Sequence, residues 1–274
     1  MSDAPGDPLV DCPVDADVLR EAVELVRRAG ELSLSWFRTD LRVEQKGDGT
    51  PVTEADRAVE RFLRVEIGRA HPDDGIVGEE EESQASSSGR TWILDPIDGT
   101  KAFTRGVPLY ANLLAIEDEY GSAVGVVNIP ALGQLLWAGR GRGCFLNGVP
   151  ARVSDRDTLD GAYCSSSGYE SWNEASLLAV KRAGMVLRTW GDGYGFLLVA
   201  SGRVDAMVDP AAERYDLAPM TVILAEAGGR FTDLSGRPTS TGGSGVATNG
   251  RIHDAVLDCL CADDRQPGRL DHDD

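Results

Sequence analysis

Two aspartates three residues apart follow a short apolar run near the middle of the sequence. The apolar residues 92–94 predict a short buried strand that delivers Asp95 and Asp98 to a sharp turn. Pro96 fixes one backbone angle of this turn, and Gly99 lets the backbone approach a ligand closely. Asp, Pro and Gly also occur in ordinary capped turns. Two carboxylates this close favour a site for a hard cation such as Mg²⁺, which shares its remaining coordination with water and phosphate.

Helical and extended patterns alternate around this stretch. Apolar residues at helical spacing predict a helix over 15–37 and another over 53–70, for which Thr53 is a suitable N-cap. Further helices are expected over 171–183, 194–201, 217–227 and 251–260, and strands over 41–45, 76–78, 109–117, 123–128, 134–138, 143–146, 161–164, 204–208, 230–232 and 245–248. The four strands between 109 and 146 predict an antiparallel run. The whole pattern predicts an α/β layered sandwich.

Length and composition set the expected domain organisation. The chain has 274 residues, 42% of them hydrophobic, which is enough for a sizeable core. We expect a flexible arm over 1–13, one domain over 14–262 and a polar tail over 263–274. The serine-rich loop over 83–89 is expected to be mobile.

Charge and cysteine content argue against several classes of protein. The net charge of −18 argues against a nucleic-acid partner. No apolar run is long enough to span a bilayer, and the polar N-terminus is unlike a signal peptide, so no membrane partner is expected. The five cysteines are scattered and contain no Cys-x-x-Cys pair, which favours a reducing cytoplasm over a disulfide scaffold or a zinc site.

The hexapeptide Asp95-Pro96-Ile97-Asp98-Gly99-Thr100 resembles the metal-binding motif of the inositol monophosphatase superfamily, which are Mg²⁺-dependent phosphatases of small phosphate monoesters. The resemblance runs from about residue 14 to residue 260. It includes, in the order of the family, Lys46, Val52-Thr53-Glu54-Ala55-Asp56, Gly78-Glu79-Glu80, Tyr215-Asp216-Leu217-Ala218 and Glu226-Ala227-Gly228-Gly229. It implies the sugar-phosphatase fold of alternating helix and sheet layers, and a homodimer is common in this superfamily.

The resemblance also implies a set of metal ligands. Glu79, Asp95 and the backbone carbonyl of Ile97 would hold a first ion, and Asp95, Asp98 and Asp216 a second. A third ion near Glu79 would give two or three Mg²⁺ per site, and Mn²⁺ would be accepted by the same oxygen ligands. A purely structural role for Asp216 would be that of a helix cap. The acidic residues after Glu79 are expected to form a solvated surface.

Three further functions are implied by the resemblance. Asp56 and Thr100, together with Glu79, would be catalytic, with Asp56 and Thr100 positioning or deprotonating the attacking water. Gly99 and Thr100 would offer backbone N–H groups to the phosphate. Asp56 also lies where an acid favours a helix dipole, so capping alone would explain it. Lys46 is directed towards the site by the resemblance, although a solvated hairpin tip explains it equally simply.

Four stretches resemble the histidinol-phosphate phosphatases of this superfamily: residues 98–101, 105–108, 165–168 and 247–254. The resemblance therefore implies a small phosphorylated alcohol as substrate, L-histidinol phosphate, in histidine biosynthesis. An inositol monophosphatase or a sugar-phosphate phosphatase with the same chemistry is the alternative.

Departures from the family pattern concentrate near the expected substrate. Trp190-Gly191-Asp192-Gly193 lacks the usual Phe, Tyr215 replaces a Trp, and Ala102 replaces an Asn. Asp209 stands seven residues before Asp216, where a Glu is usual. The candidate substrate contacts are Asp98, Lys101, Asp192, Asp209 and Glu213; for the last three, a salt bridge or a cap is an equally simple role.

Two other functions compete with this interpretation. Haloacid dehalogenase-type phosphatases use the first Asp of Asp-x-Asp-Gly-Thr as a nucleophile, but the spacing from Asp95 to Asp98 is one residue too long. A non-catalytic metal- or phosphate-binding module would lack the water-activating residues, and both Asp56 and Thr100 are present. The sequence has no His-Glu-x-x-His, Gly-x-x-x-x-Gly-Lys-[Ser/Thr] or Gly-x-Ser-x-Gly motif.

Overall fold

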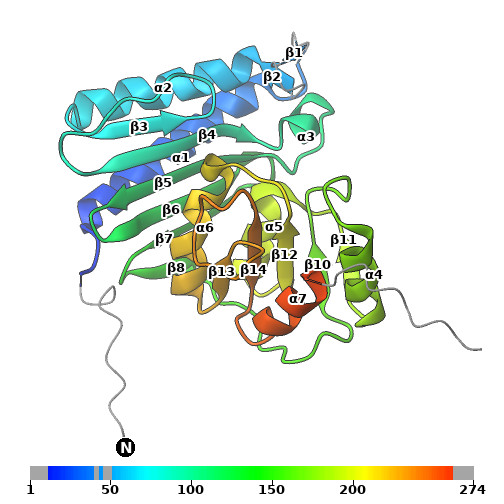
Figure 1. The fold of residues 1–274 in the computed structure, drawn as a ribbon. Helices are drawn as coiled ribbons and strands as arrows, with labels where there is room; N and C mark the ends of the chain where they lie inside the picture. Colours follow the sequence, from blue (N-terminus) through cyan, green and yellow to red (C-terminus); the bar gives the residue numbers. More distant parts are fainter. Residues whose placement is uncertain (1–11, 40–42, 46–50, 262–274) are drawn as a thin grey trace, which may run out of the picture.

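The computed structural model describes residues 12–39, 43–45 and 51–261, which form five layers in which helices and sheets alternate (Figure 1). Two long helices cover one face of a seven-stranded sheet, two more helices lie between this sheet and a five-stranded sheet, and a last pair covers the far face of the smaller sheet. The predicted layered α/β sandwich is therefore confirmed.

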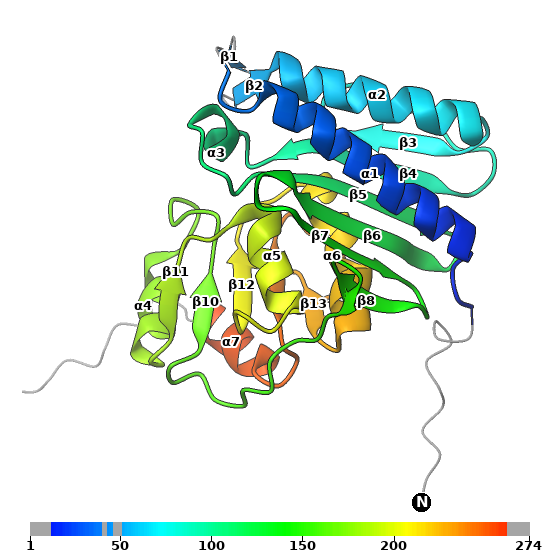
Figure 2. The same cartoon turned by 180° about the vertical axis from the view of Figure 1, so that it is seen from behind.

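The outer helix layer consists of α1 (Ala16–Trp36) and α2 (Glu54–Ala70), which pack against each other and against the large sheet (Figure 2). Both begin at a side-chain cap, Asp15 for α1 and Thr53 for α2. Their apolar faces are buried together with Trp92 and Leu94 of the sheet. Both helices lie within two residues of the predicted ranges.

The large sheet has the strand order β3-β4-β5-β6-β7-β8-β9. These strands span Gly75–Gly78, Thr91–Asp98, Ala111–Asp118, Gly121–Ile129, Gln134–Gly139, Gly143–Leu146 and Val149–Pro150, with a 3₁₀ turn at Pro130–Leu132 between β6 and β7. Only the pair β3–β4 is parallel. The predicted antiparallel run is confirmed, and Asn147 and Gly148, both with positive φ, close its last hairpin.

The two central aspartates lie on a strand, which corrects the predicted turn. Strand β4 continues to Asp98, and its pairing with β5 shifts register between Asp95 and Asp98. The chain turns only at Gly99, with φ 77°, and the short helix α3 (Thr100–Thr104) follows. The irregularity in the strand, rather than a turn, brings both carboxylates to one end of the sheet.

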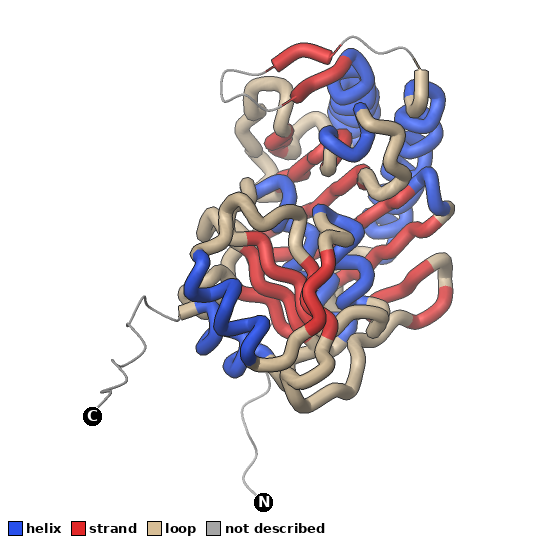
Figure 3. Tube along the Cα trace, turned by 90° about the vertical axis from the view of Figure 1, so that its right-hand side faces the viewer, coloured by secondary structure: helices blue, strands red, loops and turns tan. Residues whose placement is uncertain are grey.

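The smaller sheet, whose strands run side by side in the lower half of Figure 3, has the order β11-β10-β12-β14-β13. Its strands are β10 (Tyr163–Ser165), β11 (Val186–Arg188), β12 (Ala206–Asp209), β13 (Arg230–Thr232) and β14 (Gly245–Thr248). Helices α4 (Glu174–Arg182) and α7 (His253–Leu260) cover its outer face. Strand β11 was not predicted, because it has only three residues and carries no alternating pattern.

Two buried helices join the sheets. α5 (Asp192–Ala200) and α6 (Arg214–Ala227) pack between them, and the core on this side includes Leu113 of the large sheet and Met207 of the small one. A helix that is apolar on all sides requires such a location. Gly228, with φ 84°, ends α6 as predicted. The N-termini of both helices therefore lie in the space between the two sheets, near the end of β4.

The remaining segments differ in part from expectation. The serine-rich loop is held in place: Gln84 pairs with Ile76, and the amide of Ser87 donates to the carbonyl of Asp73 at 2.9 Å. The end of the predicted arm is also fixed, because Arg140 donates to the carbonyl of Cys12 at 2.9 Å. Strands β1 (Val43–Gln45) and β2 (Pro51–Thr53) form a small hairpin. Within the described ranges, no helix has the length and apolarity needed to cross a bilayer.

Candidate active site

Three carboxylates meet where the end of β4 approaches the start of α6. Asp95 and Asp98 come from β4, and Asp216 comes from the first turn of α6. One oxygen from each lies within 4.8 Å of the others. Asp216 lies inside the helix rather than before it, and its Oδ2 accepts the amide hydrogen of Glu213 at 2.8 Å. It is therefore a helix cap that also directs its carboxylate towards β4.

The electrostatics of the three carboxylates favour a bound cation. Burial, followed by the charge of Glu79, raises the pKa of Asp95 well above its usual range. Burial and the charge of Asp192 raise the pKa of Asp98, and burial raises the pKa of Asp216 to about 7. Oδ1 of Asp95 is buried, and no described residue makes a hydrogen bond to it. An all-oxygen donor set with an orphaned carboxylate oxygen fits a divalent cation such as Mg²⁺.

Glu79 and Ile97 lie beside this cluster. Both line a cavity of about 350 Å³ that Asp95, Asp98 and Asp216 also line. Glu79 follows directly after β3, which is the parallel neighbour of β4. All five residues that the sequence suggested as metal ligands are thus brought together, from three separate parts of the chain.

Asp56 and Thr100 lie next to each other, as their expected joint role requires. Oδ2 of Asp56 accepts the amide hydrogen of Thr53 at 2.9 Å, so this carboxylate does cap α2. Its other oxygen, Oδ1, lies 3.4 Å from the hydroxyl of Thr100, which also donates to the carbonyl of Ile97 at 3.0 Å. Burial raises the pKa of Asp56. Capping and contact with Thr100 are therefore properties of the same side chain.

Gly99 occupies a position where a side chain would be strained and crowded. Its φ of 77° is in the left-handed region, and a Cβ there would lie 2.8 Å from Oδ2 of Asp192. The helix α3 begins at the next residue, so the amides of Gly99 and Thr100 lie at the edge of the carboxylate cluster. This arrangement is compatible with the phosphate contacts that the resemblance implies.

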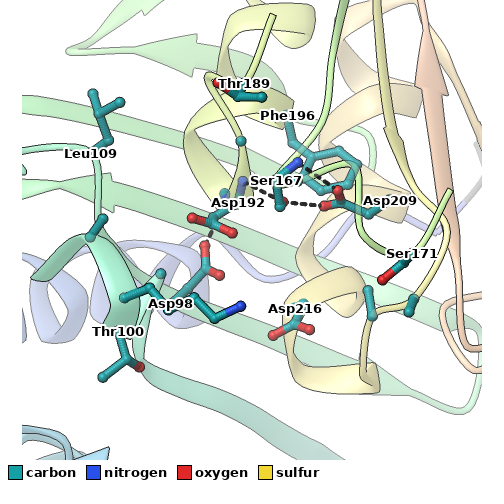
Figure 4. Close-up of a pocket in the computed structure, with 18 of the residues that line it drawn as sticks. Asp98, Thr100, Leu109, Ser167, Ser171, Thr189, Asp192, Phe196, Asp209 and Asp216 are labelled. Atoms are coloured by element: carbon teal, nitrogen blue, oxygen red, sulfur yellow. Dashed lines mark hydrogen bonds between the residues drawn. The ribbon is translucent and has the colours of Figure 1, made fainter. Parts of the chain in front are cut away.

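A larger cavity of about 450 Å³ extends from the cluster towards the smaller sheet (Figure 4). Lys101, Asp192 and Asp209 line it together with Asp98 and Asp216. Lys101 lies 3.6 Å from Glu170 across the cavity mouth, and both side chains are largely exposed. Glu213 is exposed and lines the smaller cavity beside the carboxylates instead.

The carboxylates of Asp192 and Asp209 have different surroundings (Figure 4). Asp209 accepts hydrogen bonds from the amide of Ser167 at 2.9 Å and from its hydroxyl at 2.7 Å. The same hydroxyl oxygen accepts the amide hydrogen of Asp192 at 2.8 Å. Asp192 has a φ of 54°, a backbone conformation that residues other than glycine seldom adopt. Asp209 thus holds Ser167, which in turn fixes the backbone of Asp192.

The structure adds polar groups that sequence reasoning missed. Ser167 was part of a noted stretch but was given no role, and the amide of Gly193, which donates to Oδ2 of Asp98, has no sequence signal. Glu60 is buried one helical turn after Asp56, a spacing that could have indicated it. Lys46 lies outside the described residues.

Comparisons of the sequence and of the structure with known proteins both find phosphatases. The model of the inositol monophosphatase family matches residues 15–265. The chain is 43% identical to a histidinol-phosphatase of Mycobacterium tuberculosis over 90% of this chain and 98% of that protein. It is 39% identical to a histidinol-phosphatase of Streptomyces coelicolor over 89% and 97%. Among solved structures, the Thermotoga maritima IMPase superposes with a TM-score of 0.80 at 32% identity, covering 89% of this chain and 96% of that one.

Proposed function

Because the chain belongs to the inositol monophosphatase family, we propose that it hydrolyses L-histidinol phosphate to L-histidinol and phosphate. The reaction class follows from the family: the protein is a metal-dependent phosphoric monoester hydrolase. The observation that carries the proposal is the convergence of Asp95, Asp98 and Asp216, where one buried carboxylate oxygen has no hydrogen-bond partner among the residues that the structure describes.

The residues that would hold Mg²⁺ divide into two groups. Glu79, Asp95 and the carbonyl of Ile97 would bind one ion, and Asp95, Asp98 and Asp216 a second. When bound, such ions neutralise the charge of the phosphate and lower the pKa of water. The protein supplies the ligand geometry, and the amide of Gly193 orients Asp98 by donating to it.

Asp56 and Thr100 would position the attacking water and accept its proton. The hydroxyl of Thr100 is oriented by the carbonyl of Ile97 and the carboxylate of Asp56. This leaves the lone pairs of the hydroxyl oxygen available to accept a hydrogen bond from a water. Burial of Asp56 raises its pKa, which makes this carboxylate a better proton acceptor than an exposed one.

The acidic wall of the larger cavity would select a substrate that carries a cation. Histidinol phosphate has an amine and an imidazole on the alcohol side, whereas inositol and sugar phosphates carry no cationic group there. Asp192 lines the cavity and lies near Asp98, so its carboxylate is the strongest candidate for the amine contact. Lys101, Asp209 and Glu213 remain candidates for weaker or indirect contacts with the substrate.

The decisive test is Mg²⁺-dependent phosphate release from a substrate panel. The panel contains histidinol phosphate, inositol 1-phosphate, fructose 1,6-bisphosphate and adenosine 3′,5′-bisphosphate, with Asp95→Asn as the control. We expect the highest kcat/KM for histidinol phosphate. The second candidate function is an inositol or sugar-phosphate phosphatase, because the chain is also 33% identical to a Thermotoga maritima fructose-1,6-bisphosphatase/inositol-1-monophosphatase. Faster hydrolysis of inositol or fructose phosphates would support that function instead.

We also propose that the protein is a cytoplasmic homodimer. The scattered cysteines favour a reducing compartment, and homodimers are common in the superfamily that the sequence resembles. Light scattering coupled to size-exclusion chromatography would measure the mass, and a value of one chain would contradict the dimer.

A further inference from the structure

A second buried carboxylate lies on α2, one turn after Asp56. Glu60 is completely buried, and its oxygens accept hydrogen bonds from two backbone amides and one guanidinium. Oε2 accepts the amide hydrogen of Glu80 at 2.8 Å, and Oε1 accepts that of Glu81 at 3.1 Å. Arg64 donates its Nε hydrogen to Oε1 at 2.8 Å and balances the buried charge.

These bonds fix the backbone on the C-terminal side of Glu79. Arg64 adds a further bond, from Nη2 to the carbonyl of Glu81 at 3.0 Å. A carboxylate that accepts backbone N–H groups makes charge-assisted hydrogen bonds, which are stronger than neutral ones. The segment contains four consecutive glutamates, whose mutual repulsion would otherwise favour a spread of conformations. Glu60 therefore restricts the acidic segment immediately after β3.

Glu60 also limits the size of the residue that can precede Glu79. A Cβ at Gly78 would lie 2.2 Å from Oε1 of Glu60, so only glycine leaves room for the carboxylate in its present position. Glu79 is thus flanked by Gly78 and Glu80, and both of these residues contact the same buried side chain.

We propose that Glu60 is a positioning residue that holds the Glu79 segment in place for metal binding. This inference rests on the proposed function, in which Glu79 is a metal ligand. Groups that orient the ligands of a metal site contribute to its affinity, and their loss typically weakens binding by about 10- to 100-fold. Helix α2 would then serve the site twice, through Asp56 beside Thr100 and through Glu60 behind Glu79.

The experiment is a calorimetric titration of the metal-free protein with Mn²⁺, together with thermal unfolding of the same samples. Glu60→Gln has nearly the same shape, but its NH₂ group would oppose one of the two backbone amides. We expect its Mn²⁺ affinity to fall by about 10-fold or more. Glu66→Gln is the matched control, because Glu66 lies on the same helix and, among the described residues, pairs with Arg28 and Arg69. Its Mn²⁺ affinity should equal that of the wild type.

Two further variants make every outcome decisive. Glu79→Gln removes the ligand itself; if its affinity is unchanged, the metal assignment of the proposed function fails and the present inference fails with it. If Glu79→Gln weakens binding but Glu60→Gln does not, Glu60 is merely structural and only this inference is overturned. Gly78→Ala displaces the Glu60 carboxylate from the other side. It should also weaken Mn²⁺ binding, and it decides the question if Glu60→Gln does not fold.

Discussion

The hydroxyl of Ser167 links two carboxylates of the larger cavity: it donates to Asp209 at 2.7 Å and accepts the amide hydrogen of Asp192 at 2.8 Å. The side chain at position 209 is one methylene shorter than the Glu usual in the family. It is directed at Ser167 in this structure, where it accepts two hydrogen bonds. Asp209 therefore acts on the cavity through Ser167, and Asp192 is the carboxylate whose position depends on this link.

Ser167→Ala should impair substrate binding more than catalysis. Removal of the hydroxyl leaves the amide of Asp192 without this acceptor and Asp209 with one hydrogen bond fewer. We expect KM for histidinol phosphate to rise by about 10-fold, corresponding to the loss of about 1.4 kcal/mol, with a smaller change in kcat. Steady-state kinetics measures both. Ser171→Ala, at another serine of the same cavity, is the control and should leave KM unchanged.

Asp95→Asn should abolish turnover and leave the fold intact. It should also change how stability depends on Mg²⁺. The wild-type Tm should rise with Mg²⁺, because an ion that binds only the folded state stabilises it. In metal-free buffer the variant should be more stable than the wild type by about 1 kcal/mol, since one of several mutually repelling buried acids is gone.

Thermal unfolding with Mg²⁺ and with a chelator provides the test for Asp95→Asn. A variant whose Tm rises with Mg²⁺ as much as that of the wild type would contradict the assignment of Asp95 as a ligand. Asp118→Asn is a suitable comparison, because Asp118 pairs with Arg140 at the opposite end of the sheet.

Thr100→Val should reduce kcat by about 100-fold, the usual contribution of a positioned proton-transfer group. The variant keeps the shape of the side chain but loses the hydroxyl that lies 3.4 Å from Asp56. Single-turnover kinetics would separate this effect from substrate binding. Thr189→Val, at another cavity threonine, should keep kcat near the wild-type value. An unchanged kcat in Thr100→Val would remove Thr100 from the catalytic residues.

The residues that sequence reasoning identified share a local signal. Asp95 and Asp98 stand beside an apolar run, and Thr53 stands before an amphipathic helix, so each can be recognised from its neighbours in the chain. The antiparallel order of β5–β8 follows from short connections in the same way. The location of Asp216 beside β4 depended on the resemblance, because no local pattern indicates which strand a helix start will approach.

The residues that were missed act over long sequence separations. Ser167 meets Asp209 only when β10 pairs with β12, and Gly193 meets Asp98 only when α5 packs against the large sheet. The predicted turn at 95–98 was wrong because Pro96 can also occupy a strand where the ladder is irregular. The serine-rich loop was expected to be mobile from composition, whereas backbone bonds to Asp73 hold it.

His253 should make the stability of the protein depend on pH. It is buried, with Nε2 2.9 Å from the hydroxyl of Thr232 and Nδ1 3.0 Å from that of Thr248. Burial lowers its pKa from 6.5 to about 4. Between these values the unfolded chain binds a proton that the folded chain does not, so the free energy of unfolding falls as the pH falls through this window.

His253 should lower the free energy of unfolding by about 2 kcal/mol as the pH falls from roughly 7 to 5. Urea unfolding at both pH values, on the wild type and on His253→Asn, isolates it from the titration of the carboxylates, which both proteins share. The variant should be less stable at neutral pH but should lose less stability on acidification. His71→Asn is the control, because His71 is only partly buried and pairs with Glu21. An equal pH dependence in wild type and His253→Asn would show that His253 takes up its proton in the folded state.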